Sequence, residues 1–437
     1  MFSLGRQSTL LFLSSTEGGD SLKIIYPVCC GVDVHKRTIV ATIAATDKNN
    51  ITSYSQKSFS TLNADLIAFR DWLLENGCHH VCMESTGKYW IPVFNILEDH
   101  VHVILTHPKY VRAIKGKKTD KKDSKWIADL YKHDMVRSSF IPPRNVRALR
   151  ELARYRAKLV YMRSSEKNRY QNCLTVSNIG LGNILSDPFG KTATGIIGQL
   201  LSSEIFDDEA CKALIKKSAK QKTDLILESV RGCSISPDQR FKMNAAASHI
   251  AFLDDLILRT EAELYVRLQP NYHLVEHISQ IPGISQLSAA LVLSEIGFDM
   301  DVFESAKHMT SWAGLTPANN ESAGKKKSTR ISKAGQFLKP LLVQCALAAT
   351  QDKTNPYFAI KYQRIKKRRG HKKAIIAIAR MMLVCIYHMI KTGECFNPSD
   401  FEEFQNPAPR RVVMNETNAI EFLREQGYDI TALAKVM

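Results

Sequence analysis

One acidic residue, Asp33, lies inside an apolar run with the composition of a buried strand, Val28–Val34. A carboxylate in a core strand is costly unless a partner charge or a metal ion meets it. A second β-rich run, residues 37–43, follows after a short polar connection, so the two runs predict a hairpin. The folded protein must therefore place a partner charge or a metal ion next to Asp33.

The elements expected after this hairpin alternate between helices and strands. Hydrophobic patterning predicts strands at residues 51–61, 80–84 and 101–105, and helices at residues 62–75 and 88–98. This order fits a mixed sheet with flanking helices, as in the RNase H-like fold. Ligands collect at strand ends in such sheets, and Glu84 stands at the end of its strand. We therefore expect Glu84 and Asp33 to converge.

A lysine-rich stretch, residues 116–125, carries two further aspartates, Asp120 and Asp123. If the stretch opens a helix, positions i and i+3 lie on one face and both carboxylates point at one place. Carboxylates at close quarters repel unless a cation lies between them. The lysines suit a polyanion that reaches the same spot, so one hypothesis is a divalent-metal site that acts on nucleic acid. The alternative is a charged, solvated helix N-terminus.

Positive charge is concentrated in two blocks. The chain of 437 residues has a formal net charge of +17. Residues 109–169 hold 19 Lys or Arg against 6 Asp or Glu, and residues 323–373 hold 15 against a single acid, Asp352. Two basic blocks on an otherwise acidic chain are the electrostatic pattern of a nucleic-acid binder. An anionic membrane surface fits less well, because neither block lies on an amphipathic helix beside a spanning segment.

Other kinds of site and location receive little support. The ten cysteines include no C-x-x-C pair, which favours a reduced, cytoplasmic protein with ordinary buried thiols. Cys78 and Cys82, with two histidines between them, suggest zinc, but no second ligand pair stands at finger-like spacing. No apolar run reaches the roughly 18 residues that cross a bilayer. Residues 1–25 are expected to be a disordered extension, since their apolar content is too low for a secretory signal.

The composition changes after Pro143. Residues 145–172 predict a long basic helix, whose apolar stripe suits either a coiled coil, and hence a dimer, or a helix packed on its own domain. The chain then continues helical. Residues 278–296 resemble a helix-hairpin-helix that offers backbone N–H groups to DNA phosphates. A plain connection between helices is the alternative, since Ser285 stands where a second glycine is usual.

A loop rich in small residues and cations, residues 312–335, contains Ser322. This serine is unhindered and precedes three lysines, Lys325–Lys327, which is the setting that a hydroxyl attacking a DNA phosphate needs. The alternative is a flexible basic loop with incidental serines. A second basic run, residues 364–373, lies between two expected apolar helices and is a phosphate-binding candidate.

Taken in order, several short motifs resemble the DEDD transposases of the insertion-sequence 110 family, the bridge-RNA-guided recombinases. The matching stretches span residues 28–391 and are Gly31–Lys36, Met83–Gly87, Lys118–Asp123, Ser138–Pro143, Ile281–Gly283 and Trp312–Lys327. No single stretch decides the match, but the ordered set is specific. It favours the metal site over a solvated helix end, and a nucleophilic serine over an incidental one.

The resemblance implies an α/β RNase H/RuvC-like N-terminal domain, with a mixed sheet and flanking helices, followed by a mainly α-helical C-terminal half. Its acidic tetrad falls on Asp33, Glu84, Asp120 and Asp123, and its nucleophilic serine falls on Ser322, with Glu321 where some members carry another serine. The expected divisions are an extension at 1–25, the RuvC-like metal-binding domain at 26–143, a helical, coiled-coil-like region at 144–270, the transposase domain with its helix-hairpin-helix-like segment and serine loop at 271–395, and a tail at 396–437.

The function implied by the resemblance is that of a transposase or recombinase of an insertion sequence. The tetrad is expected to hold Mg²⁺, as two ions, and Ser322 to form a transient phosphoserine link to DNA. The expected partners are donor and target DNA, a non-coding bridge RNA and further copies of the chain in a dimer or tetramer. The setting is the cytoplasm of a bacterium or archaeon, at the nucleoid and away from membranes. The expected nucleic-acid-binding residues are Lys117, Lys118, Lys121, Lys122, Lys325, Lys326, Lys327, Arg330, Lys333, Lys366, Lys367, Arg368 and Arg369.

Two other functions stay open at the level of the sequence. A hydrolytic RuvC-like Holliday-junction nuclease would use the same tetrad without a covalent intermediate, but it needs no serine and leaves the C-terminal half unexplained. A non-catalytic nucleic-acid-binding relative would have no use for an intact tetrad.

Overall fold

The computed structural model of the chain describes residues 22–84, 87–108, 111, 120–202, 207–317, 320–322, 325–328, 330–398, 400, 419 and 422–424. These residues fold as two units with separate cores, which divide the chain into residues 1–141 and 142–437. In the described residues, the first unit is an α/β structure and the second is helical apart from one two-stranded hairpin.

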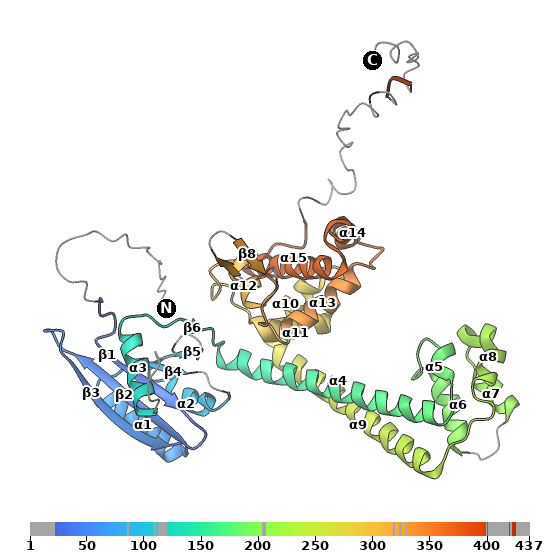
Figure 1. Cartoon of the computed structure of the whole chain (residues 1–437), viewed down its shortest axis with the longest axis horizontal. Helices are drawn as coiled ribbons and strands as arrows, with labels where there is room; N and C mark the ends of the chain where they lie inside the picture. The colour runs from blue at the N-terminus through green and yellow to red at the C-terminus, as the bar shows by residue number, and fades with distance from the viewer. Residues whose placement is uncertain are drawn as a thin grey trace. The chain divides into compact units, whose positions relative to one another are not determined.

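The first unit is built on a six-stranded mixed sheet (Figure 1). Its strands are β1 (Val28–Val34), β2 (Thr38–Thr46), β3 (Thr52–Ser60), β4 (His80–Glu84), β5 (His102–Thr106) and β6 (Ser138–Ser139). Their spatial order is β3-β2-β1-β4-β5-β6, in which β4 is parallel to β1 and β5 to β4, and the other neighbours are antiparallel. This arrangement confirms the predicted mixed sheet with flanking helices, as expected of an RNase H-like domain.

Helices cover both faces of this sheet. They are α1 (Asn63–Glu75), α2 (Trp90–Leu97) and α3 (Asp120–Lys132). Side chains alternate along β1, so Val32 packs with α1 and α2 on one face, whereas Cys29 packs with α3 on the other. Asp33 has the same parity as Cys29 and therefore faces α3.

Helix α3 lies against β1 at Gly31 more closely than a side chain would permit. A Cβ atom at Gly31 would lie 2.3 Å from the backbone nitrogen of Ala128 and 2.3 Å from the carbonyl oxygen of Ser124. Hydrogen bonds hold the helix there, because the buried Ser124 hydroxyl lies 2.8 Å from Thr42 Oγ1 and accepts from Gln56 Nε2 at 3.2 Å. This contact fixes the first turn of α3 over the end of β1.

The packing of the two cysteines argues against the zinc alternative. Cys78 is buried in the core beneath α1 and α2, whereas Cys82 is buried in the core beneath α3. Burial raises the pKa of both thiols, as expected of inert core cysteines. The two thiols therefore pack into separate cores, as expected of structural cysteines.

The second unit begins with a long helical hairpin whose arms are α4 (Arg144–Val176) and α9 (Pro237–Leu268). Three ion pairs bridge the arms, Arg156–Glu261, Arg163–Asp254 and His249–Glu166. Residue numbers rise along α4 as those of the partners fall along α9, so the arms are antiparallel. The basic helix predicted at residues 145–172 therefore packs on another helix of its own chain.

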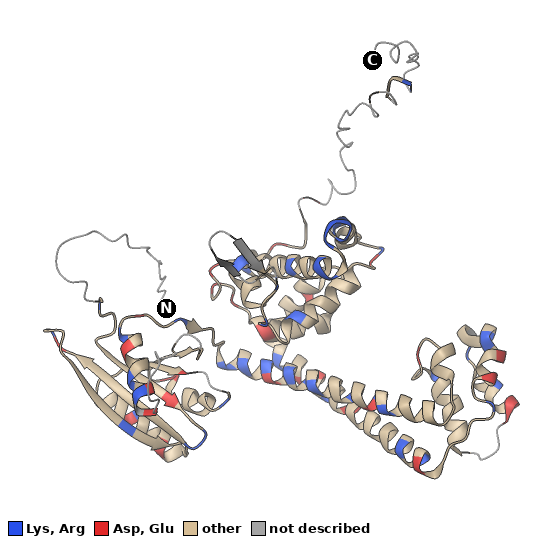
Figure 2. Ribbon diagram, viewed as in Figure 1, with Lys and Arg blue, Asp and Glu red and all other residues tan. Residues whose placement is uncertain are grey.

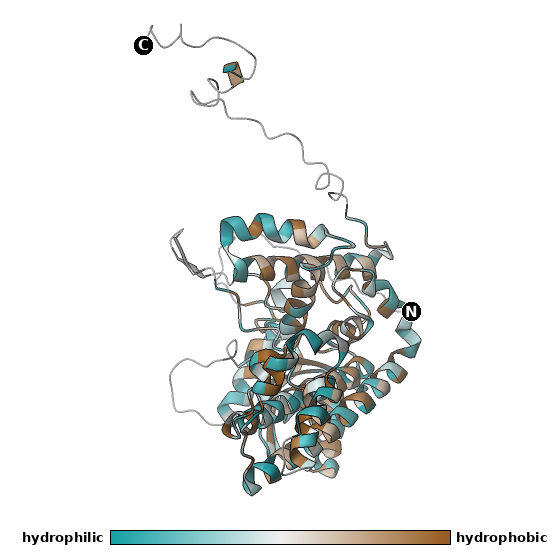
Figure 3. Cartoon of the chain, turned by 90° about the vertical axis from the view of Figure 1, so that its right-hand side faces the viewer, coloured by the Kyte–Doolittle hydropathy of each residue, from teal (hydrophilic) through white to brown (hydrophobic). Residues whose placement is uncertain are grey.

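A small lobe and a larger bundle complete the second unit. The lobe contains α5 (Leu181–Ile184), α6 (Lys191–Ser202), α7 (Asp208–Leu214), the 3₁₀ helix η1 (Lys217–Lys222) and α8 (Thr223–Glu228). The bundle contains η2 (Gln269–Asn271), α10 (Tyr272–Ser279), α11 (Gln286–Ile296), α12 (Ala306–Trp312), β7 (Asn320–Ser322), β8 (Lys325–Ser328), α13 (Leu338–Ala349), α14 (Tyr357–Arg369) and α15 (His371–Thr392). Hydrophobic and hydrophilic residues alternate around these helices (Figure 3), as expected of packed amphipathic helices.

One helix in the described part of the chain, α15, is long and apolar enough to cross a membrane by length and composition. Half of that apolar stretch is buried inside the protein, where α15 packs against α10, α12, α13 and α14. The expectation that the sequence holds no such segment is thus corrected. The apolar sequence of α15 forms the central helix of a bundle.

The connection between α10 and α11 is part of the core. Ile281 and Ile284 are buried, and a Cβ atom at Gly283 would lie 2.5 Å from the carbonyl oxygen of Cys345 in α13. The Ser285 hydroxyl accepts a hydrogen bond from a backbone N–H in the first turn of α11 and so caps that helix. This packing favours a plain connection between helices over an exposed phosphate-binding hairpin.

Replacing Gly31 by alanine should destabilise the first unit, because the added methyl group would overlap the backbone of α3. We expect the free energy of unfolding to fall by about 3 kcal/mol. Urea unfolding followed by tryptophan fluorescence measures this, since Trp72, Trp90 and Trp126 lie in this unit. Gly198→Ala is the control, because its site on α6 has open space and should change stability by less than about 1 kcal/mol. Equal midpoints for Gly31→Ala and the wild type would contradict the close approach.

Candidate active site

Two of the predicted acids stand at the ends of neighbouring parallel strands. Asp33 lies near the end of β1, and Glu84 is the last residue of β4. The two strands pair in a register that aligns Val32 with Met83, so the next position on each strand is an acid. Because Met83 packs beneath α1 and α2, alternation turns Glu84 toward the face that Asp33 shares with α3.

The other two predicted acids open α3. Asp120 is its first residue, and Asp123 follows three positions later on the same side. Both lie in the first turn, where the helix dipole favours negative charge. The close contact at Gly31 brings this turn over the end of β1, so the four acids come from three elements that meet at one end of the sheet.

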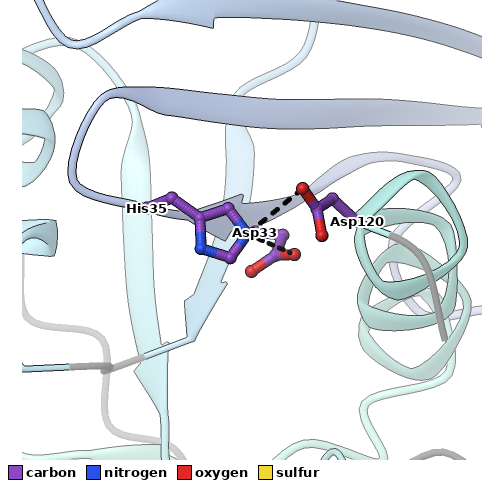
Figure 4. A group of neighbouring side chains, drawn as sticks. All are labelled: Asp33, His35 and Asp120. Carbon is purple, nitrogen blue, oxygen red and sulfur yellow. Dashed lines mark ion pairs between the residues drawn. The ribbon is translucent and has the colours of Figure 1, made fainter.

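A histidine outside the predicted set of site residues, His35, joins two of these acids, as Figure 4 shows. His35 lies in the turn between β1 and β2, where its backbone N–H donates to the Thr38 carbonyl at 2.9 Å. Its Nε2 atom lies 3.3 Å from Asp33 Oδ2 and 3.4 Å from Asp120 Oδ2. The sequence does hold one signal for His35. It stands two positions after Asp33, and in an extended chain two such residues point to the same side.

Burial and negative charge act together on Asp33, which is only 8% exposed. Burial raises the pKa of Asp33, His35 lowers it, and the carboxylates of Asp120, Glu84 and Asp123 raise it further, so the net shift is upward. The other three predicted acids are thus close enough to act on the charge of Asp33.

The arrangement suits a cation. Asp33, His35 and Asp120 each offer one ligand atom, and these three atoms all lie within 4.8 Å of one another. In the described residues this is the only group of acidic, histidine or cysteine side chains with that geometry. Carboxylate oxygens are the ligands of Mg²⁺ and Mn²⁺, and an imidazole nitrogen adds affinity for transition metals.

Ser322 lies on a short strand pair that the sequence did not predict. Strands β7 and β8 pair antiparallel, with Ser322 opposite Lys325. For residues 320–322 and 325–327, only the backbone belongs to the described structure. Ser322 belongs to the second unit, whereas the four acids belong to the first.

Backbone packing closes the base of the loop that carries Ser322. A Cβ atom at Gly335 would lie 2.1 Å from the carbonyl oxygen of Ala313, and one at Gly314 would lie 2.4 Å from the carbonyl oxygen of Ala334. Both glycines also have positive φ values, of +69° at Gly314 and +67° at Gly335, a region that favours glycine. The two ends of the loop therefore touch backbone to backbone.

Lys339 of α13 also binds the base of the loop that carries Ser322. Its Nζ donates to the carbonyl oxygens of Ser332 and Ala334 at 2.8 and 2.9 Å, and burial lowers its pKa. An isolated bridge between Pro317 and Ile331 adds a further tie across the loop. An anchored base of this kind argues against a loop that is flexible throughout.

Most arginines on α4, in the first basic block, are paired within the chain. The pairs are Arg150 and Arg154 with Glu295 of α11, Arg156 with Glu261, Arg163 with Asp254, and Arg169 with Glu166. Glu295 is 5% exposed, and burial lowers the pKa of Arg150 to about 10. The formal charge of this block therefore overstates the positive charge that is free to meet a phosphate.

The second basic run, residues 364–373, carries exposed cations (Figure 2). The segment predicted as a connection is the last turn of α14 followed by the first turn of α15, with Gly370 at a φ of +80° between them. Its exposed cations are Lys366, Lys367, Arg368, Arg369, Lys372 and Lys373. Cations crowded at one junction suit a polyanion.

Some of the remaining predicted phosphate-binding cations are described only in part. Lys117 and Lys118 lie outside the described residues, and only the backbone of Lys121 is described, in α3. Lys122 is exposed on α3, and Arg330 and Lys333 are exposed in the second unit.

Replacing Asp33 by asparagine should stabilise the metal-free protein. The amide keeps the shape of the side chain but removes a buried negative charge that three other carboxylates repel. In the presence of EDTA we expect a higher thermal unfolding temperature for Asp33→Asn than for the wild type. Glu75→Gln, which removes an exposed charge in the same unit, should leave it nearly unchanged. A lower unfolding temperature for Asp33→Asn would show that the charge of Asp33 is already compensated.

Replacing Lys339 by methionine should loosen the serine loop, because the two carbonyl oxygens at its base lose their donor. We expect amide hydrogen exchange in residues 330–335 to speed up at least about tenfold, the effect of losing roughly 1.4 kcal/mol. Lys353→Met, at an exposed site of the same bundle, is the matched control. Unchanged exchange in Lys339→Met would mean that the glycine contacts alone hold the loop.

Two family models match the chain. The first, named for the DEDD transposases of IS110 and described as a transposase, matches residues 30–179. The second, described as the transposase IS116/IS110/IS902 family, matches residues 275–363. The four predicted acids lie within the first matched range, and Ser322 lies within the second.

Known proteins with similar sequences include the pilin gene-inverting protein of Moraxella bovis, 24% identical over 380 residues, which are 84% of this chain and 97% of that protein. The transposase for insertion sequence element IS1111A of Coxiella burnetii is 23% identical over 332 residues, 74% of this chain and 80% of that protein. An uncharacterized 42 kDa protein of insertion element IS900 from Mycobacterium paratuberculosis is 28% identical over 172 residues; the match covers 38% of this chain and 42% of that relative. Together these matches confirm the resemblance seen in the motifs, and the chain belongs to the IS110 family of transposases.

Proposed function

We propose that this chain cuts and rejoins DNA during transposition of an insertion sequence, with a divalent metal held by Asp33, Glu84, Asp120 and Asp123. The observation that carries the proposal is the cluster of Asp33, His35 and Asp120 at one end of the sheet. The pKa of Asp33 is raised by burial and, further, by the nearby carboxylates of Asp120, Glu84 and Asp123. The name of the Moraxella bovis relative, a gene-inverting protein, supports it, because inversion also requires DNA strands to be cut and rejoined.

The donor set fits Mg²⁺, most simply as two ions. The carboxylates of Asp120, Glu84 and Asp123 all repel that of Asp33, and a divalent cation held among them would relieve that repulsion. Mg²⁺ bound there supplies polarisation of the scissile phosphate and stabilises the charge on the leaving oxygen. Asp33 and Asp120 face the same point as His35 Nε2, so the imidazole is a further ligand or hydrogen-bond donor at that point.

Ser322 supplies the nucleophile in this proposal. Its Oγ attacks the phosphorus, so that an Oγ–P bond forms while the P–O3′ bond breaks and the 3′ oxygen takes up the proton. A 3′ hydroxyl of another strand then attacks the phosphoserine, the P–O3′ bond forms again, and Ser322 recovers a proton. The number of phosphodiester bonds is unchanged, so the reaction needs no ATP. Lys325, Lys326 and Lys327 follow the serine in the sequence and neutralise phosphate charge.

Sequence recognition is assigned to a non-coding bridge RNA that pairs with donor and target DNA, so that the protein contacts shape and backbone. The exposed cations at the junction of α14 and α15 support a role in binding phosphates. A dimer or tetramer in the cytoplasm, acting on DNA at the nucleoid, completes the proposal.

Ser322→Ala should abolish a covalent protein–DNA adduct. Wild-type protein, RNA and nicked or duplex DNA are incubated with Mg²⁺, denatured and separated by electrophoresis, and we expect a shifted band that EDTA prevents. Asp120→Asn should lower its yield by about 100-fold or more, since it removes part of the metal site. Ser328→Ala, at an exposed position at the end of β8, is the control that should keep the adduct.

Two outcomes would favour the other functions. DNA cleavage that survives Ser322→Ala without any adduct would indicate a hydrolytic nuclease. Binding without cleavage by the wild type would indicate a non-catalytic nucleic-acid-binding protein.

A further inference from the structure

An imidazole nitrogen, which is no part of the four-acid set, faces two of the acids at once. His35 Nε2 lies 3.3 Å from Asp33 Oδ2 and 3.4 Å from Asp120 Oδ2 (Figure 4). Because Nε2 carries at most one hydrogen, it cannot donate a well-directed hydrogen bond to both oxygens. Both distances also exceed the roughly 2.7–2.9 Å of a charge-assisted hydrogen bond to a carboxylate. Hydrogen bonding alone therefore explains this contact poorly.

The same distances suit three ligands of one ion. Ligand atoms at neighbouring corners of an octahedral site lie about 3 Å apart when each is about 2.1 Å from the ion. The Nε2 atom and the two Oδ2 atoms all lie within 4.8 Å of one another. The two distances from the nitrogen would have to shorten by only a few tenths of an ångström to match such a site.

Solvent, and hence an ion, can reach this group of atoms. The carboxylate of Asp33 comes from a buried strand, but the side chains of His35 and Asp120 are 47% and 58% exposed. The turn that carries His35 is held by its backbone N–H, which donates to the Thr38 carbonyl at 2.9 Å. The imidazole therefore starts beside the two acids and has room to adjust.

We propose that His35 Nε2 is a direct metal ligand, and that the ion it shares with Asp33 and Asp120 is consequently bound more tightly as Mn²⁺ than as Mg²⁺. An imidazole nitrogen favours first-row transition metals, whereas Mg²⁺ prefers oxygen ligands. The inference rests on the proposed function and deepens it, because it makes one position of the metal site selective. A site built of carboxylates alone would distinguish the two ions less.

Pulsed electron paramagnetic resonance of the full-length protein loaded with Mn²⁺ tests the ligand directly, because a coordinated nitrogen nucleus modulates the electron spin echo. We expect strong nitrogen modulation in the wild type and its loss in His35→Ala. The matched control is His100→Ala. It removes an exposed imidazole two residues before β5, at the end of the sheet away from Glu84, and should keep the modulation.

His35→Gln separates ligation from hydrogen bonding, because a glutamine amide can donate to the two acids but lacks the imidazole nitrogen. Mn²⁺ affinity is measured from the signal of free Mn²⁺, and Mg²⁺ affinity by competition. We expect His35→Ala and His35→Gln each to weaken Mn²⁺ binding at least about tenfold, since even the loss of an outer-shell partner can cost that much. Mg²⁺ binding should change less, so the ratio of the two affinities should fall.

Wild-type protein that binds Mn²⁺ without nitrogen modulation would overturn the inference and leave the carboxylate site in place. A wild-type affinity ratio in His35→Gln would also overturn it, because His35 would then only position the acids. If the wild type binds neither ion, the metal site of the proposed function fails together with the inference.

Discussion

The passage of α3 across Gly31 is the contact on which the candidate active site depends. Only a residue without a side chain lets the backbone at Ser124 and Ala128 come this close to β1. The hydrogen bond that Ser124 accepts from Gln56, and the one that links its hydroxyl with Thr42, then fix the rotation of the helix about its axis. Asp120, one turn earlier, consequently lies beside the end of β1, where strand alternation has already turned Asp33 toward the helix.

This geometry sets stability against function. A carboxylate that is buried and surrounded by three others raises the energy of the folded protein without a cation, as the raised pKa of Asp33 indicates. His35 compensates part of that repulsion because its Nε2 lies between Asp33 and Asp120. An arrangement that is unfavourable alone and favourable with a divalent cation is expected of a metal site and not of a solvated helix end.

Much of this site could be predicted from local patterns. The position of Asp33 in an apolar strand, the start of α3 at Asp120 and the order of strands and helices all follow from short-range sequence signals. The pairing of Arg150 and Arg154 could not be predicted, because Glu295, the acid that binds both, lies more than 140 positions away. For the same reason, a count of Lys and Arg gives α4, whose arginines are mostly paired, and the exposed junction at residues 366–373 the same apparent capacity to bind phosphate. The closure of the serine loop could not be predicted either, since it depends on the backbone contacts of Gly314 with Ala334 and of Gly335 with Ala313, which no side-chain pattern reveals.

The central claim is that the ends of β1, β4 and α3 form a divalent-metal site. Anomalous X-ray diffraction from crystals grown with Mn²⁺ tests it most directly. We predict an anomalous peak within about 2–2.5 Å of carboxylate oxygens of Asp33 and Asp120, with His35 either bound to the ion or displaced from between the two acids. No peak at this position, with His35 still paired to both carboxylates at saturating Mn²⁺, would contradict the account.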